Sequence, residues 1–142
     1  MPLLEVSDLQ IAVAAGGTLL PVVRGVSFAL GEDETLGIVG ESGCGKSLTS
    51  LAIMGLLEGS QVRVTGGSIR FDGRELTSLP PKDRRAIMGD QMAMIFQEPM
   101  TSLNPVYRIG DQIVETLRQH LKLTRRQARD RAVELLDLVR IP

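Results

Sequence analysis

A glycine-rich segment over residues 40–47 has the residue types that are needed to hold a phosphate group. Its members fit the pattern G-x-x-x-x-G-K-[ST] and are Gly40, Glu41, Ser42, Gly43, Cys44, Gly45, Lys46 and Ser47. Glycines let the backbone curl closely around a phosphate and aim successive N–H groups at its oxygens. Lys46 would place a positive charge beside the β- and γ-phosphates, and the Ser47 hydroxyl would coordinate Mg²⁺. The sequence therefore predicts a nucleotide site, to which Leu48 contributes its backbone N–H.

The elements on both sides of this segment suit a phosphate loop. A short apolar run over residues 35–39 predicts a strand that Gly40 ends, and apolar side chains at helical spacing predict a helix over 46–57. The N-terminus of that helix would add the attraction of its dipole for phosphate. We interpret the lone Cys44 as a small loop residue without a redox role. The loop alone leaves the class open, because kinases, GTPases, helicases and transport ATPases all share it.

A second candidate group is Gln97, at the end of a strand predicted over residues 91–96. Pro99 follows closely, and because proline cannot donate to a strand ladder we expect the strand to stop at the glutamine. A neutral amide can coordinate Mg²⁺ or accept a hydrogen bond from water without adding negative charge beside a triphosphate. Taken alone, a glutamine that ends a strand and binds nothing is the simpler interpretation.

The remaining pattern predicts a compact mixed α/β fold. We expect strands over 3–14 and 25–30 as an antiparallel pair, a further strand over 65–73 and a short helix over 83–88. Two amphipathic helices follow, and Thr124 with Gln127 has the spacing of a capping box at the start of the second. Their apolar faces comprise Ile109, Ile113, Val114, Leu117 and Leu121 in the first helix, and Ala128, Ala132, Leu135, Leu136 and Val139 in the second.

Composition narrows the classes of function. The 142 residues are 43% hydrophobic and 23% charged, which suits one globular domain. The net charge of -1 removes a general attraction to nucleic acid or anionic membranes. A single cysteine, no apolar run of the roughly 20 residues that span a bilayer and no secretory signal favour the cytoplasm. A basic group is interpreted as a solvated helix face and comprises Lys122, Arg125, Arg126, Arg129 and Arg131.

The order of strand, phosphate loop, helix and later strand ending in Gln97 resembles the nucleotide-binding subunits of ABC transporters. Residues 97–105, Gln-Glu-Pro-Met-Thr-Ser-Leu-Asn-Pro, are similar to the importers of oligopeptides, dipeptides and nickel in particular. Residues 26–28, 35–43 and 51–56 also resemble that subgroup. The resemblance therefore extends over nearly the whole chain.

This resemblance implies an α/β P-loop NTPase core of the ABC-ATPase type, incomplete, with an N-terminal antiparallel β subdomain and C-terminal helices. Residues 1–142 would be the N-terminal part of one ATP-binding domain, with a strand hairpin, the P-loop, a glutamine loop and the start of the helical subdomain. The implied function is the ATP-binding component of an importer for peptides or nickel, which couples ATP binding and hydrolysis to solute uptake.

The resemblance also assigns roles and partners. ATP and Mg²⁺ would be the cofactors, Lys46 and Gln97 the catalytic groups, and Ser47 and Gln97 the metal ligands, with the oxygen of Gln97 reaching Mg²⁺ or the attacking water. The loop over 98–110 would contact membrane-spanning permease subunits, and a second ATP-binding subunit would complete the dimer. We expect a peripheral location on the inner face of the cell membrane, and no nucleic acid.

The sequence departs from the family pattern in several places. A signature segment of the Leu-Ser-Gly-Gly-Gln type, a second acidic strand with a catalytic glutamate and a switch histidine are not found; His120 lies too early, and residues 133–137 have helical spacing. We therefore expect weak nucleotide binding, negligible turnover by this chain alone, and marginal stability or association. Val13 stands where the family stacks an aromatic residue on adenine, and Leu48 where threonine is common.

Two alternatives remain open. The chain could be a non-hydrolysing nucleotide-binding or docking module, for which ATP binding without hydrolysis would be the sign. It could also be another P-loop ATPase of nucleic-acid maintenance or a small-molecule P-loop kinase. Those should show a basic groove or a phosphate-acceptor site, and the low net charge argues against the groove.

Overall fold

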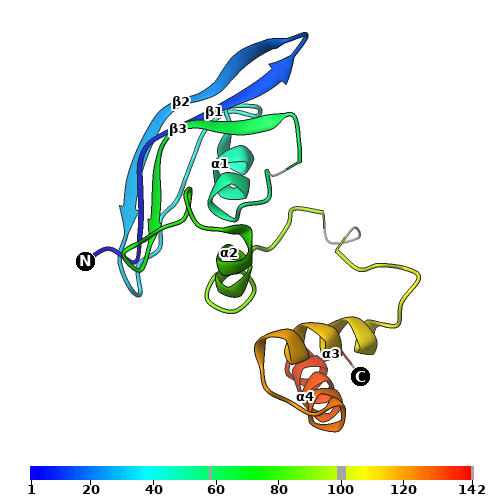
Figure 1. Cartoon of the computed structure of the whole chain (residues 1–142). Helices are drawn as coiled ribbons and strands as arrows, with labels where there is room; N and C mark the ends of the chain where they lie inside the picture. Colours follow the sequence, from blue (N-terminus) through cyan, green and yellow to red (C-terminus); the bar gives the residue numbers. More distant parts are fainter. Residues whose placement is uncertain (58, 99–101, 142) are drawn as a thin grey trace. The chain divides into compact units, whose positions relative to one another are not determined.

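The computed structural model describes residues 1–57, 59–98 and 102–141. Its contacts divide the chain into two compact units, Met1–Arg84 and Arg85–Pro142. The first unit holds a sheet and the helix α1 (Lys46–Ile53), and the second holds the helices α3 (Ile109–His120) and α4 (Arg125–Leu138) (Figure 1). The short helix α2 (Pro81–Ile87) includes the division between the two units.

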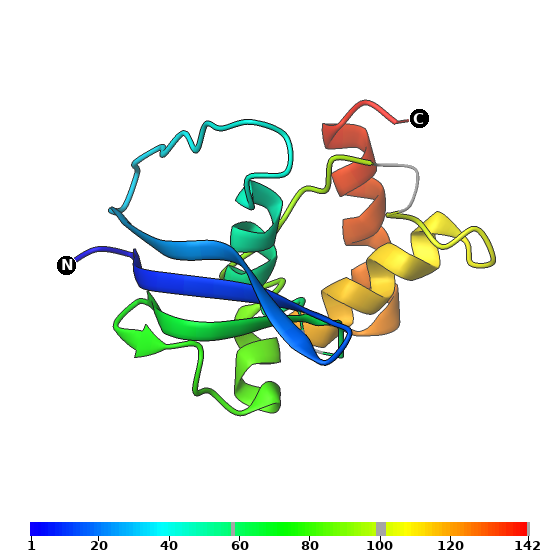
Figure 2. The same ribbon diagram turned by 90° about the horizontal axis from the view of Figure 1, so that it is seen from above.

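An antiparallel sheet of four strands, in the order β2-β1-β3-β4, organises the first unit. The strands are β1 (Leu4–Ala15), β2 (Thr18–Leu30), β3 (Val62–Phe71) and β4 (Arg74–Glu75). Both glycines of the β1–β2 turn, Gly16 and Gly17, have positive φ, which glycine adopts without steric cost. The predicted antiparallel pair is confirmed, although β2 begins before residue 25, and α1 lies against one face of the sheet (Figure 2).

A bulge in β1 decides which side chains enter the core. Asp8 has φ 46, and the register with both neighbouring strands shifts around it. The extra residue moves Leu9 and Ile11 to the same face as Val6, and all three are buried. They pack with further buried side chains from the rest of the unit, which include Ile69, Phe71, Leu76, Ala52 and Ile53.

The second unit is a helical hairpin of α3 and α4. The predicted capping box is confirmed: Gln127 N donates to Thr124 Oγ1 at 3.3 Å, and Thr124 N donates to Gln127 Oε1 at 2.9 Å. Ala128 and Ala132 are buried on α4. Among the described residues, no helix is both long and apolar enough to span a bilayer.

Two predicted strands are wrong, and the predicted helix over 46–57 ends early, at Ile53. Residues 34–40 have no regular structure, and Val39 is 96% exposed. Residues 93–96 are irregular too, with Ile95 98% exposed; nearby there is one isolated bridge, between Met88 and Met92. A strand needs a neighbour for its N–H and C=O groups, and no described segment pairs with either run.

The close approach of α1 to β2 positions the start of this helix. Gly45 is buried with φ 93, and a Cβ at this position would lie 2.7 Å from Cγ2 of Val23. At Gly43, with φ 83, a Cβ would have no neighbour within 4 Å. Gly45 therefore satisfies both a backbone and a packing requirement, whereas Gly43 satisfies only the first.

We expect Gly45→Ala to lower the free energy of unfolding by about 3 kcal/mol, because left-handed strain and overpacking add, and Gly43→Ala by about 1–2 kcal/mol. Urea denaturation of both variants measures the difference. Gly45→Ala combined with Val23→Ala should lose less than the sum of the single losses. Equal losses of unfolding free energy in the two glycine variants would contradict the close packing of Gly45 against Val23.

The carboxylate of Glu75 fastens the β3–β4 hairpin. It accepts hydrogen bonds from Ile69 N at 3.1 Å, from Thr77 N at 3.3 Å and from the Thr77 hydroxyl, and its other oxygen lies 3.5 Å from Nε of Arg70. Burial raises the pKa of Glu75, but the hydrogen bonds from Thr77 and Ile69 and the nearby Arg70 lower it more. Its pKa therefore lies below the ordinary value of 4.5.

Because the folded-state pKa of Glu75 is below the unfolded value, its ionised form stabilises the fold above pH 4.5, and this contribution is lost as the pH falls through the folded-state pKa. We expect Glu75→Gln to have a lower free energy of unfolding than the wild type at neutral pH, and this difference should become smaller in acid. Urea denaturation across this range measures it. As a control, Asp72→Asn removes an exposed carboxylate 3.8 Å from Arg74 and should change little. A gap that is independent of pH would contradict this role.

Candidate functional site

The predicted phosphate loop lies entirely in the first unit. Gly45 is the N-cap of α1, and Lys46, Ser47 and Leu48 are the first three residues of the helix. The loop is exposed from Glu41 to Cys44, while Gly45 is buried. The structure therefore brings the sequence-predicted residues 40–48 together on one loop and one helical turn.

The loop curls tightly at its beginning as well as at its end. A Cβ on Gly40 would lie 2.6 Å from Sγ of Cys44, so no larger residue fits there without movement of that side chain. Cys44 N donates to the carbonyl of Glu41 at 3.3 Å and closes a turn inside the loop. Cys44 is free and exposed, and its Sγ lies 3.5 Å from Nζ of Lys46.

The ammonium group of Lys46 occupies the inside of this curl. Its Nζ donates to the backbone carbonyls of Gly40 and Glu41, both at 2.7 Å. An ammonium has three donors and no acceptor, so these two bonds use most of its capacity. The positive charge therefore lies within hydrogen-bond distance of the carbonyl oxygens of both residues that begin the loop.

The start of α1 offers unused donors beside this charge. Among the described residues, no group accepts a hydrogen bond from the backbone N–H of Gly45, Lys46, Ser47 or Leu48. The first helical bond runs from Thr49 N to Gly45 O at 2.9 Å. Such groups carry the positive end of the helix dipole. A tight cradle, free N–H groups and an ammonium fit a phosphate, which would accept from all of them.

Both ends of α1 are fixed by side chains. The buried hydroxyl of Thr49 donates to Gly45 O at 3.0 Å. At the other end, the guanidinium of Arg84 donates to the carbonyls of Ala52 at 2.7 Å and Ile53 at 3.3 Å, which places a cation at the negative end of the helix dipole. Gly55 leaves room for it, since a Cβ there would collide with Arg84.

Sequence reasoning assigned no role to Arg84. Its partners lie 31 and 32 positions away along the chain, so no local sequence pattern predicts these hydrogen bonds. The glycine at position 55 with φ +70 is the one indirect sign, and a sequence does not show what would fill the space beside it.

Gln97 is exposed, in an irregular segment of the second unit, whereas the phosphate loop belongs to the first. Its approach to Lys46 and Ser47 thus stays a prediction. Of the loop predicted to dock on membrane subunits, residues 99–101 lie outside the described residues. In its described part, Gln112 Nε2 donates to the carbonyls of Asn104 at 2.9 Å and Tyr107 at 3.0 Å, which ties the loop to α3.

The expected metal has few protein ligands here. Among the described residues, no group of three or more His, Cys, Asp or Glu side chains could hold an ion. The Ser47 hydroxyl is exposed and has no hydrogen-bond partner among the described residues, so it could coordinate an ion whose other ligands are phosphate oxygens and water. Val13 lies in β1 between Leu20 and Val62, so the position expected to carry an aromatic residue is aliphatic and half-buried.

Residues 23–142 match the family described as ABC transporter. The oligopeptide transport ATP-binding protein AppD of Bacillus subtilis is 48% identical over 96% of this chain and 42% of its own length. The oligopeptide transport ATP-binding protein OppD of Salmonella typhimurium is 45% identical over 99% of this chain and 41% of its own length. The chain thus spans about two fifths of these relatives.

Solved structures agree on the fold. The dimeric post-hydrolysis state of the ATP-binding cassette MJ0796 bound to ADP and Pi has a TM-score of 0.74 at 23% identity, over 94% of this chain and 56% of that one. The dimeric MJ0796 cassette gives a TM-score of 0.78 at 24% identity. The predicted α/β fold class is confirmed as a partial ABC-ATPase core. The chain belongs to the ABC transporter family.

Proposed function

We propose that residues 1–142 are the N-terminal part of one ABC ATP-binding domain, and that this domain is the ATP-binding component of a peptide importer. The observation that carries the proposal is the seat of Lys46 among unused N–H donors at the start of α1. Peptides are preferred over nickel because the relatives named above are oligopeptide transport proteins by name.

The phosphate loop would bind a nucleotide by exchanging the hydrogen-bond acceptors of Lys46. Lys46 gives up the neutral carbonyls of Gly40 and Glu41 for anionic phosphate oxygens, which form stronger charge-assisted hydrogen bonds. The N–H groups at the start of α1 donate to the same phosphates without moving the helix. The Ser47 hydroxyl coordinates Mg²⁺, which ATP brings with its own oxygens.

Gln97 and the loop after it are proposed to link nucleotide and membrane partners. Gln97 is exposed, so its amide is available to Mg²⁺ or to the attacking water. Within the loop that follows, Val106 and Tyr107 expose apolar surface, with exposed fractions of 83% and 64%. A permease subunit covering this loop over 98–110, on the inner face of a cell membrane, would remove that surface from water.

We further propose that this 142-residue chain binds nucleotide but does not hydrolyse it by itself, and that a second ATP-binding subunit belongs to the working assembly. The Asp that holds the magnesium shell and the Glu that polarises water in this family have no counterparts in the sequence, and stabilisation of the transition state depends on such groups. The exposed apolar run at Leu36, Ile38 and Val39 supports a further strand beside it in the complete domain.

Calorimetry with Mg-ATP tests the proposal directly. We expect saturable binding by the wild type, and binding at least about tenfold weaker for Lys46→Ala, because a charged partner of the phosphates is lost. Lys122→Ala removes an exposed lysine elsewhere in the sequence and should leave the affinity unchanged. A phosphate-release assay should show no turnover above background.

Two results would count against it. If folded Lys46→Ala binds Mg-ATP as tightly as the wild type, the loop is not the nucleotide site. If the wild type releases phosphate and Lys46→Ala does not, the site stands and the proposed lack of hydrolysis is wrong. Circular dichroism of each variant establishes that it is folded.

A further inference from the structure

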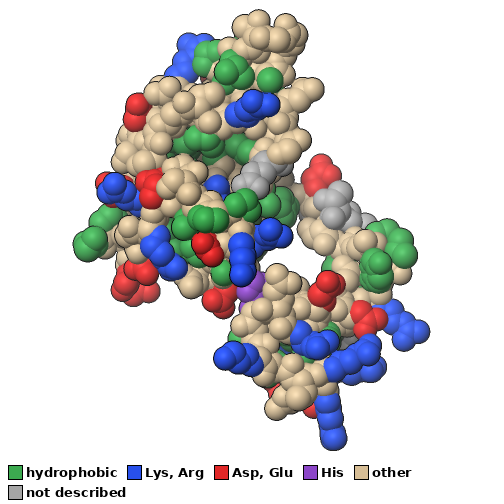
Figure 3. All heavy atoms as spheres, in the orientation of Figure 1, with side chains coloured by type: hydrophobic (Ala, Val, Ile, Leu, Met, Phe, Trp, Pro, Cys, Tyr) green, Lys and Arg blue, Asp and Glu red, His purple; other side chains and the backbone are tan. Residues whose placement is uncertain are grey.

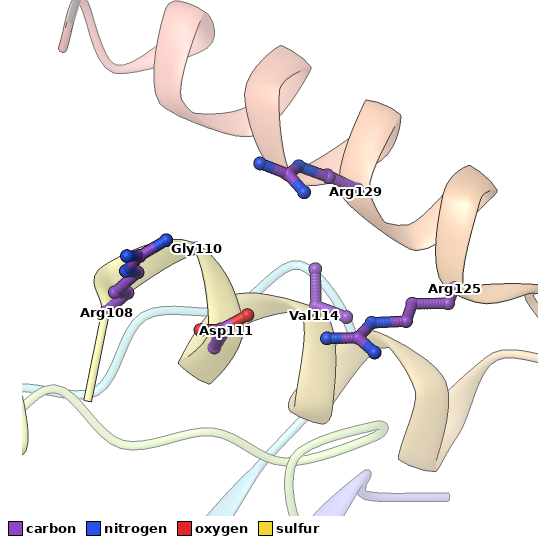
Figure 4. Close-up of a pocket in the computed structure, with 6 residues that line it drawn as sticks. All are labelled: Arg108, Gly110, Asp111, Val114, Arg125 and Arg129. Atoms are coloured by element: carbon purple, nitrogen blue, oxygen red, sulfur yellow. The ribbon is translucent and has the colours of Figure 1, made fainter.

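A pocket of about 370 Å³ opens between α3 and α4, within the second unit. Its lining residues are Arg108, Gly110, Asp111, Val114, Arg125 and Arg129. Figure 4 shows that Arg108 and Asp111 come from the start of α3, and Arg125 and Arg129 from α4. Residues from both arms of the hairpin therefore line one cavity.

The charges of this pocket are not neutralised by neighbours. Among the described residues, none of the side chains of Arg108, Arg125 and Arg129 forms an ion pair or hydrogen bond, and the carboxylate of Asp111 accepts none. By contrast, Arg131 on the same helix α4 is paired with Glu134 at 2.7 Å. In the space-filling view, Lys and Arg side chains are numerous over the part of the chain that holds α3 and α4 (Figure 3).

The number of donors indicates the chemistry of the ligand. Each guanidinium presents a planar fork of N–H groups, and three forks offer more donors than the two oxygens of a carboxylate can accept. A phosphoryl group has more oxygens and a larger charge. At the start of α3, Gly110 has no side chain, and a Cβ there would have no neighbour within 4 Å, so a ligand can approach the backbone.

Asp111 refines this choice. A carboxylate in an otherwise cationic pocket opposes a fully ionised tetrahedral anion such as sulfate, but it can accept a hydrogen bond from a phosphoryl oxygen that keeps its proton. We propose that this pocket binds a phosphoryl group that keeps one proton, such as hydrogen phosphate or the monoanion of a phosphate monoester, through Arg108, Arg125 and Arg129, with Asp111 accepting the hydrogen bond of its P–OH group. The source is a soluble phosphate or the headgroup of a lipid.

Two arginines of the basic group over residues 122–131 do more than form the solvated helix face that the sequence predicts. Arg125 and Arg129 line the pocket. Arg108 joins them from the N-cap of α3, which sequence spacing alone did not connect with α4. Arg126 is exposed and does not line this pocket, so it provides a matched control.

Titration calorimetry with inorganic phosphate on the 142-residue chain tests the site. To keep the phosphate loop from contributing, each pocket variant is compared in the wild type and in a Lys46→Ala background. We expect Arg125→Gln and Arg129→Gln each to weaken phosphate binding about tenfold or more, and Arg126→Gln, with the same loss of charge, to change it less than about twofold. Sulfate should bind more weakly than phosphate, and Asp111→Asn should narrow that preference.

Each result of these experiments either supports the phosphate site or overturns it. Equal weakening by Arg126→Gln and Arg129→Gln means diffuse charge attraction and overturns the site, as does the absence of phosphate binding by folded wild-type chain. Equal binding of sulfate and phosphate overturns the role of Asp111. Co-sedimentation with vesicles that contain phosphatidic acid, but not with phosphatidylcholine alone, assigns the lipid source if Arg129→Gln abolishes it. Phosphate binding without co-sedimentation assigns the soluble source.

Discussion

The first turn of α1 must keep its N–H groups unpaired while the helix itself stays fixed, and the candidate site depends on this combination. Unpaired donors favour fraying, because no acceptor among the described residues holds these N–H groups in place. Three contacts oppose it: Gly45 packs against Val23, Thr49 bonds back to Gly45, and Arg84 closes the far end. The helix is therefore held by its sides and its C-terminus, and its N-terminus is left for a ligand.

The same arrangement limits the affinity that the loop can reach. Without a ligand, Lys46 already donates to two carbonyls at 2.7 Å, so an incoming phosphate must replace those bonds rather than meet a bare charge. The gain is the difference between a charged and a neutral acceptor, to which the orphan N–H groups add. Val13, at the position where the family resemblance leads us to expect an aromatic residue, is aliphatic and half-buried, so this side chain offers no aromatic face.

Local sequence signals predicted local structure well. The glycine-lysine pattern, the Thr124–Gln127 spacing and the Gly16-Gly17 turn act within a few residues, and the structure has all three features. Features that depend on distant partners were missed: the Arg84 cap, the change of register at the Asp8 bulge, and the lack of a pairing partner among the described residues for the apolar runs over 35–39 and 93–96. Apolar composition shows that a segment could be a strand, whereas hydrogen-bonding neighbours decide it.

The net charge of -1 does not exclude local binding sites for anions. It removes a long-range attraction to polyanions, but anion sites act within roughly 8–10 Å, where screening is incomplete and geometry dominates. The chain shows two ways to hold cations at that range. The ammonium group of Lys46 donates to two backbone carbonyls, and an anionic acceptor such as phosphate could replace them. Among the residues that the structure describes, the arginines around the α3–α4 pocket have no such acceptors, and an unbalanced group of guanidinium ions is stabilised most by an anion that contacts several at once.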